Sequence, residues 1–221
     1  MQFLHLQSLY AFIHVVVASK IQGKIVFITM KIKPKPDSYY SDQNARSGTG
    51  ANVNTLWKDL QLAKVQFDKN WCVLDIGCRT GITLHDLWKR GFKNVYGVDI
   101  GELAQQHWIK SKYVFIKNLI RDDVHKLDFV DESFDLITIS HALEHLYDPH
   151  LVLRKMISSL KHGGMIHSIV PLDPEADFDK YNPHLVRFES HEDHLKFYTD
   201  SGLVKVFDEL RHGNSIAIVK K

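Results

Sequence analysis

The stretch VLDIGCRTGITL, residues 73–84, begins as an apolar run and breaks into a turn that carries Gly77 and Gly81. An apolar run that ends in a glycine turn and continues as a helix is typical of an α/β sheet. Gly77 can adopt a tight-turn conformation, and Gly81 lets the start of the next helix approach a ligand. Arg79 is unexpected in such a turn. Its side chain either blocks a ligand, joins the binding site of that ligand or points away from it.

Apolar runs and amphipathic segments alternate along the chain after this turn. Apolar runs of this kind predict parallel strands covered by helices on both faces. The last two runs flank a turn at Gly213-Asn214, which predicts an antiparallel hairpin at the sheet edge. The expected fold class is therefore α/β, a doubly wound, seven-stranded, mostly parallel sheet with a C-terminal antiparallel hairpin. The predicted strands are 72–76, 95–99, 113–118, 134–140, 165–171, 204–210 and 215–220.

Helical spacing of apolar residues marks the segments between these strands. Ser190 and Asp193 form a capping-box pattern before the last of them. Gly163-Gly164 is expected to stop the one over residues 151–160. The predicted helices cover 53–67, 83–90, 103–110, a short segment through His145, 151–160 and 190–201.

Composition limits the classes of function. The 221 residues are 44% hydrophobic and 24% charged, as in a globular domain of moderate size with an appendage. The formal net charge of +2 gives no global field for nucleic acid or an anionic membrane. Cys72 and Cys78 would lie roughly 13 Å apart along an extended strand, too far for a disulfide. We therefore expect reduced thiols and a cytoplasmic protein.

The N-terminal segment is apolar between residues 9 and 18, interrupted by His14. It is shorter than the about 20 apolar residues of a membrane span. No basic residue precedes it, so a signal peptide or membrane association through residues 3–18 is the weaker alternative. Met30 is a candidate start, in which case residues 1–29 would be an upstream extension.

Four places at the carboxyl ends of predicted strands carry residues suited to a ligand. The first is the glycine turn, and the second is Asp99, about 20 residues later, where a carboxylate can accept hydrogen bonds from ribose hydroxyls. The third is the polar segment 121–124, suited to the edge of an adenine ring. The fourth is the segment 140–145, SHALEH, directly after the fourth strand.

These places lie in four stretches: VLDIGCRTG, VYGVDIGE, RDDVHKLDFVDESFDLITISHALEHL and LKHGGMIHSIVP. In this order and spacing they resemble the motif series of class I S-adenosylmethionine-dependent methyltransferases of the small-molecule type, over about residues 70–220. The turn at residues 77–82, GCRTGI, does not match the G-x-G-x-x-G fingerprint of dehydrogenases. The resemblance implies a Rossmann-like methyltransferase fold.

The resemblance implies S-adenosylmethionine as the cofactor, no metal ion, and a small-molecule, lipid-like or sugar-like acceptor that is methylated by in-line displacement. The turn after the first strand would hold the methionine end, Asp99 the ribose, and Asp123 with Val124 the adenine. The segment from Ser140 to His141 would line the floor near the sulfonium. The implied cofactor-binding residues are Asp75, Gly77, Cys78, Gly81, Asp99, Ile100, Asp123, Val124 and Ser140.

A general base is needed only for a hydroxyl or a protonated amine acceptor. His141 is the first candidate, and the alternative is a pocket-wall residue that orders the loop. His184 is the second candidate, against a solvated loop histidine. His145 is expected to hydrogen-bond within the fold, and Glu144 to cap or brace its helix. Tyr39 and Tyr40 could close over the acceptor or simply pack.

Other interpretations remain open at this stage. His141, Glu144 and His145 also spell H-x-x-E-H, a zinc-peptidase signature that needs both histidines on one helix. A module that binds the cofactor and catalyses nothing is supported by Arg79 alone. A nucleic-acid methyltransferase would share the fold, but the near-neutral charge counts against it.

The chain is expected to divide into three parts. An uncertain apolar extension would cover residues 1–29. An entry segment with a helix would cover residues 30–69, and the S-adenosylmethionine-binding methyltransferase domain would cover residues 70–221.

Overall fold

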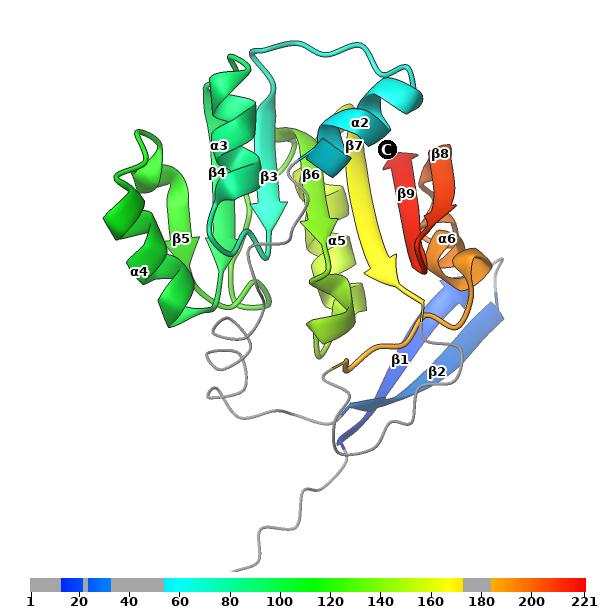
Figure 1. Ribbon diagram of the computed structural model, residues 1–221. Coiled ribbons are helices and arrows are strands. Elements are labelled where there is room, and N and C mark those ends of the chain that lie inside the picture. The colour runs from blue at the N-terminus through cyan, green and yellow to red at the C-terminus, as the bar shows by residue number, and fades with distance from the viewer. Residues whose placement is uncertain (1–12, 22–23, 33–53, 173–183) are drawn as a thin grey trace, which may run out of the picture. The chain divides into compact units, whose positions relative to one another are not determined.

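Figure 1 shows the computed structural model, which describes residues 13–21, 24–32, 54–172 and 184–221. The chain divides into two compact units, residues 1–36 and residues 37–221. In the first unit, β1 (Ile13–Ile21) pairs with β2 (Lys24–Ile32) as an antiparallel hairpin. The predicted boundary at residue 29 falls inside β2, and the three-part division stays a prediction.

The second unit contains a seven-stranded sheet in the order β5-β4-β3-β6-β7-β9-β8. The five strands from β5 to β7 are parallel, β9 is antiparallel to β7, and β8 is antiparallel to β9. This confirms the predicted fold class. The bounds are β3 Cys72–Ile76, β4 Asn94–Asp99, β5 Leu119–Arg121, β6 Phe134–Ser140, β7 Leu160–Pro171, β8 Val204–Arg211 and β9 Asn214–Lys220.

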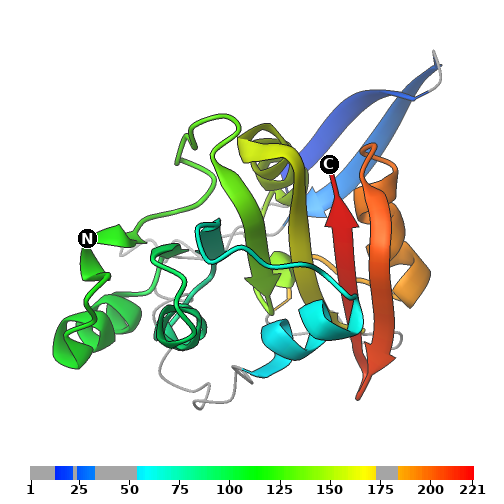
Figure 2. The same ribbon diagram turned by 90° about the horizontal axis from the view of Figure 1, so that it is seen from above.

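Helices cover both faces of this sheet. Figures 1 and 2 show α2 and α3 over one face and α5 and α6 over the other. Within β6, Leu136 packs into one buried apolar cluster and Ile137 into the other, so both strand faces are apolar. The bounds are α2 Asn54–Leu62, α3 Ile82–Lys89, α4 Glu102–Ser111, α5 Pro149–Ser159 and α6 His191–Thr199, with 3₁₀ turns η1 Ile116–Asn118 and η2 Leu143–His145.

The third predicted strand, residues 113–118, is wrong. These residues form a turn and η1, and β5 begins only at Leu119. Two rings of this stretch cover α3: the Phe115 ring lies 5.8 Å from that of Trp88, and the Tyr113 ring lies 4.9 Å from that of His85. Apolar character alone does not distinguish such a covering segment from a buried strand.

Two predicted helix ends also differ. The helix expected over 53–67 ends at Leu62. The helix expected to stop at Gly163-Gly164 ends at Ser159, because those glycines lie inside β7. A Cβ at Gly164 would lie 3.0 Å from the carbonyl oxygens of both Lys161 and Phe134. Glycine therefore avoids close contacts at the register shift of the β6–β7 pairing.

The turn of the C-terminal hairpin is shifted by one residue from the prediction. His212 and Gly213 both have positive φ, 51° and 74°, and Asn214 already pairs with Arg211 in the sheet. A two-residue hairpin whose central residues both have positive φ matches the right-handed twist of the strands. The turn therefore lies at His212-Gly213.

The capping box of α6 is confirmed by reciprocal hydrogen bonds between Ser190 and Asp193. His194, in the first turn of α6, is fully buried. Its Nε2 lies 2.9 Å from Ser168 Oγ and its Nδ1 lies 2.7 Å from Ser215 Oγ. Burial, with smaller contributions from nearby histidines, lowers the pKa of His194 to about 3. This imidazole therefore joins α6 to β7 and β9 as a neutral group.

The predicted membrane-association segment is only partly described. Residues 13–18 lie in β1, and residues 3–12 lie outside the described residues, as do Tyr39 and Tyr40. In the part of the chain that the structure describes, no helix combines the length and apolar content that crossing a membrane requires.

Candidate active site

The loop after β3 is tied to the end of β4 by its backbone. The N–H groups of Gly77 and Cys78 both donate to the carbonyl of Val98, at 2.8 and 3.1 Å. Gly81 closes the turn by donating to the carbonyl of Cys78 at 2.7 Å. Gly77 and Gly81 have φ values of 73° and 74°, a region that side-chain-bearing residues rarely adopt. Both glycines therefore have the turn role that the sequence predicts.

Arg79 also has a positive φ, 45°. The backbone here therefore has a left-handed conformation that glycine adopts more readily, and the arginine also adopts it. Two hydrogen bonds hold this residue: its N–H donates to Asp99 Oδ2 at 2.8 Å, and its carbonyl accepts from Trp108 Nε1 at 2.5 Å. The left-handed conformation costs about 1–2 kcal/mol. The hydrogen bonds of the Arg79 N–H and carbonyl hold the backbone in it.

Asp99 ends β4 with a buried carboxylate, 7% exposed. Oδ2 accepts from Arg79, and Oδ1 accepts from the N–H of Gly101 at 2.8 Å. Burial raises the pKa of Asp99, while these two N–H groups and the Arg79 charge oppose the rise. An ionised carboxylate offers about four acceptor positions, so two ribose hydroxyls could still donate to it. The backbone fixes the direction in which those positions point.

Asp75 lies beside Asp99, on β3, and is 5% exposed. Burial and, secondarily, the charge of Asp99 raise the pKa of Asp75 to about 8. Within residues 54–172 and 184–221, no group donates a hydrogen bond to this carboxylate. A buried carboxylate of this kind needs either a proton or a cationic partner.

A close approach joins the glycine turn to the segment after β6. A Cβ at Gly77 would lie 2.6 Å from the Cβ of Ala142.

The Cys78 thiol packs against β4, because a Cβ at Gly97 would lie 2.7 Å from Cys78 Sγ. Burial, with the charges of Asp75 and Asp99, raises the pKa of Cys78 well above its usual range. Cys78 therefore contributes to the loop through the hydrogen bonds of its backbone N–H and carbonyl.

Asp123 and Val124 follow β5 and connect to the same region, because the N–H of Asp122 donates to the carbonyl of Asp99 at 3.1 Å. The Asp123 carboxylate is held within the protein: Oδ1 lies 2.6 Å from His125 Nδ1, and Oδ2 accepts from the Tyr147 hydroxyl at 3.3 Å. The His125 and Tyr147 rings stack at 3.6 Å. Val124 packs into the core. Their adenine-facing role stays a prediction.

The segment after β6 brings His141 and Glu144 together. Ser140 ends β6, and the N–H of His141 donates to the carbonyl of Ile169 at 2.9 Å. The His141 side chain is 46% exposed, while that of Glu144 is 2% exposed. Their Nδ1 and Oε1 atoms lie 3.7 Å apart. His141 thus lies at an accessible place beside a buried carboxylate.

The expected helix through His145 is a single 3₁₀ turn, η2. His141 lies before it with a φ of 51°, so the one-helix arrangement that the zinc-peptidase signature needs does not form. His145 Nε2 lies 4.0 Å from Glu144 Oε1, and the His145 and His184 ring centroids are 5.2 Å apart. The structure therefore gathers Glu144, both flanking histidines and His184.

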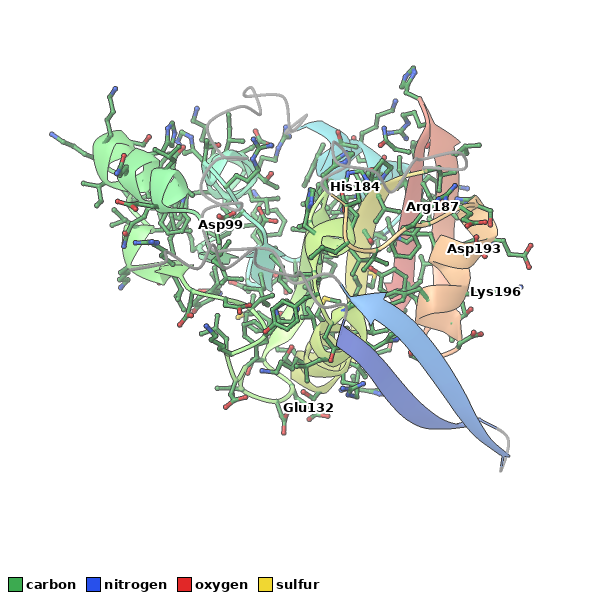
Figure 3. All side chains as sticks on the ribbon, turned by 90° about the horizontal axis from the view of Figure 1, so that it is seen from below. Asp99, Glu132, His184, Arg187, Asp193 and Lys196 are labelled. Atoms are coloured by element: carbon green, nitrogen blue, oxygen red, sulfur yellow. The ribbon has the colours of Figure 1, made fainter. Side chains whose placement is uncertain are left out.

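Backbone hydrogen bonds of Glu144 hold the segment after His184 close to η2. The Glu144 carbonyl accepts from the N–H groups of Leu185 and Val186, at 2.7 and 3.0 Å. Glu144 was predicted to cap or brace its own helix, whereas its main chain here holds the segment that begins at Leu185. Figure 3 views the sheet from the edge where the parallel strands end, and it shows Asp99 by β4 and His184 on the segment that leads to α6.

Three contacts in this site are not evident from the sequence. Ala142 meets Gly77, Trp108 donates to the Arg79 carbonyl, and His125 holds Asp123. Ala142 and Trp108 are distant in sequence from their partners, so no local pattern indicates them. The contact of His125 with Asp123 could have been predicted, because the two residues are only two positions apart in the sequence.

Comparison with known proteins bears on this geometry. Residues 44–210 match a family described as methyltransferase domain. Two curated relatives are named ubiquinone biosynthesis O-methyltransferase. The one from Hydrogenovibrio crunogenus is 28% identical over 129 residues, which are 57% of this chain and 52% of the relative. The one from Vibrio vulnificus is 28% identical over 180 residues, 71% and 70% of the two chains.

The chain spans about half the length of several of these relatives, 52% in Hydrogenovibrio crunogenus and 46% in Pseudomonas fluorescens. A solved S-adenosylmethionine-dependent methyltransferase from Aquifex aeolicus superposes with a TM-score of 0.63 at 18% identity. The superposition covers 85% of this chain and 99% of that one. A likeness at this identity shows a shared fold.

Proposed function

The chain belongs to the class I S-adenosylmethionine-dependent methyltransferase family, and we propose that it methylates a hydroxyl group of a small, lipid-like or sugar-like acceptor. The family and the fold imply S-adenosylmethionine as the cofactor. The observation that carries the proposal is the pair of buried carboxylates, Asp75 and Asp99, at the ends of β3 and β4. One is pre-oriented by the backbone, and the other lacks a counter-charge.

This donor set fits the cofactor. Its ammonium group would supply the positive charge that the Asp75 carboxylate requires, and its ribose hydroxyls would donate to the remaining acceptor positions of Asp99. Gly77 and Gly81 would leave room for the methionine end. Asp123 and Val124 would approach the adenine from the segment after β5, and Ser140 would lie beneath the reacting centre.

The bound cofactor supplies a methyl group on a cationic sulfur, which is an electrophile. The protein has to hold an acceptor oxygen in line with that methyl group, so positioning supplies much of the rate. His141, exposed and at the end of β6, would take the proton from the acceptor hydroxyl. The short distance between the glycine turn and Ala142 would keep this segment next to the cofactor loop.

The oxygen acceptor is proposed from the relatives. Both of the curated relatives described above are named O-methyltransferases of ubiquinone biosynthesis. A phenolic or catechol-type compound with an apolar chain is therefore the first acceptor class to test. The alternative of a module that binds and does not catalyse was supported by Arg79 alone, and Arg79 keeps the loop conformation of a glycine.

An acceptor panel tests the proposal. The protein is incubated with methyl-labelled S-adenosylmethionine and phenols, catechols, sugar alcohols or amines, and both S-adenosylhomocysteine and labelled product are measured. We expect label on oxygen, with a rate at least tenfold lower in His141→Gln. His162→Gln, at an exposed position of β7, is the matched control and should turn over normally. Cofactor binding without turnover on any acceptor would favour the non-catalytic module.

A further inference from the structure

We propose that Glu144, His145 and His184 bind one divalent transition-metal ion beside the acceptor position. The sequence offers a metal here only through the zinc-peptidase signature of His141, Glu144 and His145. The present cluster differs, because the fold brings His184 to η2. One carboxylate oxygen and one imidazole nitrogen from each histidine all lie within 4.8 Å of one another. Metal binding by these residues is independent of the proposed function, whereas the role of the metal rests on it.

The spacing lets one ion bind after a modest movement of the side chains. Bonds of about 2.0–2.2 Å place two ligand atoms of a tetrahedral ion about 3.3–3.6 Å apart. The three ligand atoms lie within 4.8 Å of one another and would therefore have to approach by up to about 1.5 Å. Rotation of the His145 and His184 rings could supply that, since both are only half-buried.

The buried carboxylate is the second observation. Glu144 is 2% exposed, and its Oε2 has no hydrogen-bond partner. A buried carboxylate oxygen without a partner is costly, and the usual compensation is a proton, a cation or a metal. The nearest side-chain nitrogens to Oε1 are those of His141 and His145, at 3.7 and 4.0 Å, both beyond hydrogen-bond length. The carboxylate thus faces the imidazoles without being satisfied by them.

The donor set selects the kind of ion. Two imidazoles and one carboxylate are typical of sites with open positions that hold zinc or iron, whereas magnesium prefers oxygen ligands. Zn²⁺ is the simplest occupant, because methyl transfer needs no redox chemistry. The fourth position would stay open to water or to the acceptor, which leaves His141 as the base.

The location suggests a role in the reaction. Ala142 contacts the glycine turn, and Glu144 follows two residues later, so the metal would lie on the acceptor side of the cofactor loop. An acceptor hydroxyl bound to it would release its proton to His141 more readily, because a divalent ion lowers the pKa of a bound oxygen acid. The oxyanion would then form the new C–O bond, and the C–S bond would break with its electron pair leaving on sulfur.

Metal analysis tests the site directly. Chelator-treated protein is dialysed against Zn²⁺, Mn²⁺ or Mg²⁺, and bound metal is measured by mass spectrometry. We expect one equivalent of Zn²⁺ bound in preference to Mg²⁺, and affinity at least tenfold lower in His184→Ala and in the near-isosteric Glu144→Gln. His162→Ala is the control and should bind as wild type. Absence of stoichiometric metal in wild type, or wild-type affinity in either cluster variant, would overturn the proposal.

Two further readouts separate metal binding from folding and from the proposed function. Co²⁺ substitution should give a visible absorption band in wild type that His184→Ala loses. Binding of S-adenosylhomocysteine, measured by calorimetry, should be retained in the cluster variants, which shows that they are folded. A protein that binds Zn²⁺ but methylates no acceptor would contradict the proposed function and leave the metal site standing.

Discussion

The backbone N–H of Arg79 donates to Asp99 Oδ2 at 2.8 Å, so the residue that looks out of place in the glycine turn orients the acid at the end of the next strand. The contact uses the main chain, which any residue offers. What distinguishes Arg79 is its φ of 45° and its charge, which offsets part of the rise that burial causes in the pKa of Asp99. The side chain and the backbone can therefore be tested separately.

Arg79→Gly should relieve left-handed strain of about 1–2 kcal/mol, partly offset by about 0.4–1 kcal/mol of extra chain entropy in the unfolded state. We expect a net gain of about 0.5–1 kcal/mol in the free energy of unfolding, measured by urea denaturation. Arg79→Ala removes the same side chain but keeps the strain. Equal cofactor affinity in both variants and wild type would show that the guanidinium is not a ligand, whereas equally weakened binding would show that it is.

Gly77→Ala should be much more disruptive than Gly213→Ala. Both residues have φ near 74°, but a Cβ at Gly213 meets nothing within 4 Å, while at Gly77 it meets Ala142 at 2.6 Å. Strain alone costs about 1–2 kcal/mol, and overpacking adds about 1–3 kcal/mol. Urea denaturation should therefore show about 2–5 kcal/mol lost at Gly77 and about 1–2 at Gly213. Equal losses would contradict the close approach.

Asp75→Asn should change how stability depends on pH. The folded-state pKa of Asp75 is raised to about 8, so folding favours the protonated acid. This contribution is complete below pH about 4 and is lost as the pH rises to 8, by up to about 1.4 kcal/mol per pH unit. As the pH rises from about 4 to 8, the free energy of unfolding of the variant should increase relative to that of wild type. Urea denaturation measures this difference. Asp131→Asn, at an exposed position, is the control. A pH-independent difference would refute the raised pKa.

His194→Gln should flatten the loss of stability in acid. Because the folded pKa is lowered to about 3, the neutral imidazole stabilises the fold above the unfolded pKa near 6.5, and this stability is lost as the pH falls towards 3. Wild type should lose up to about 1.4 kcal/mol per pH unit through this residue below pH 6.5. Thermal unfolding of both proteins between pH 7 and 5 measures the difference, and parallel curves would refute the assignment.

The sequence predicted the fold through its glycine turn and its alternation of apolar runs. It placed β3, β6 and the carboxylate of Asp99 correctly, because these depend on local periodicity and on one spacing of about 20 residues. It misplaced β5, since Tyr113 and Phe115 cover α3 and are as apolar as a strand. It also ended α5 too late, because glycines can stop a helix or form a strand irregularity.

The acceptor side of the site was less accessible to sequence reasoning. His141, Glu144 and His145 are adjacent and were singled out, but their surroundings depend on the backbone hydrogen bonds that carry His184 from a separate segment. Burial of one carboxylate and exposure of its neighbour also follow from tertiary packing. A motif therefore indicates which residues are involved, and the fold determines whether they form a pocket wall, a base or a ligand set.

Calorimetric titration with S-adenosylhomocysteine, comparing wild type with Asp99→Ala, tests the central claim most directly. The account places the cofactor in the loop that Arg79 and Asp99 hold together. It predicts one binding site in wild type and an affinity at least tenfold lower in the variant, which loses the ribose acceptor. Binding of equal strength in both proteins would contradict the placement of the site.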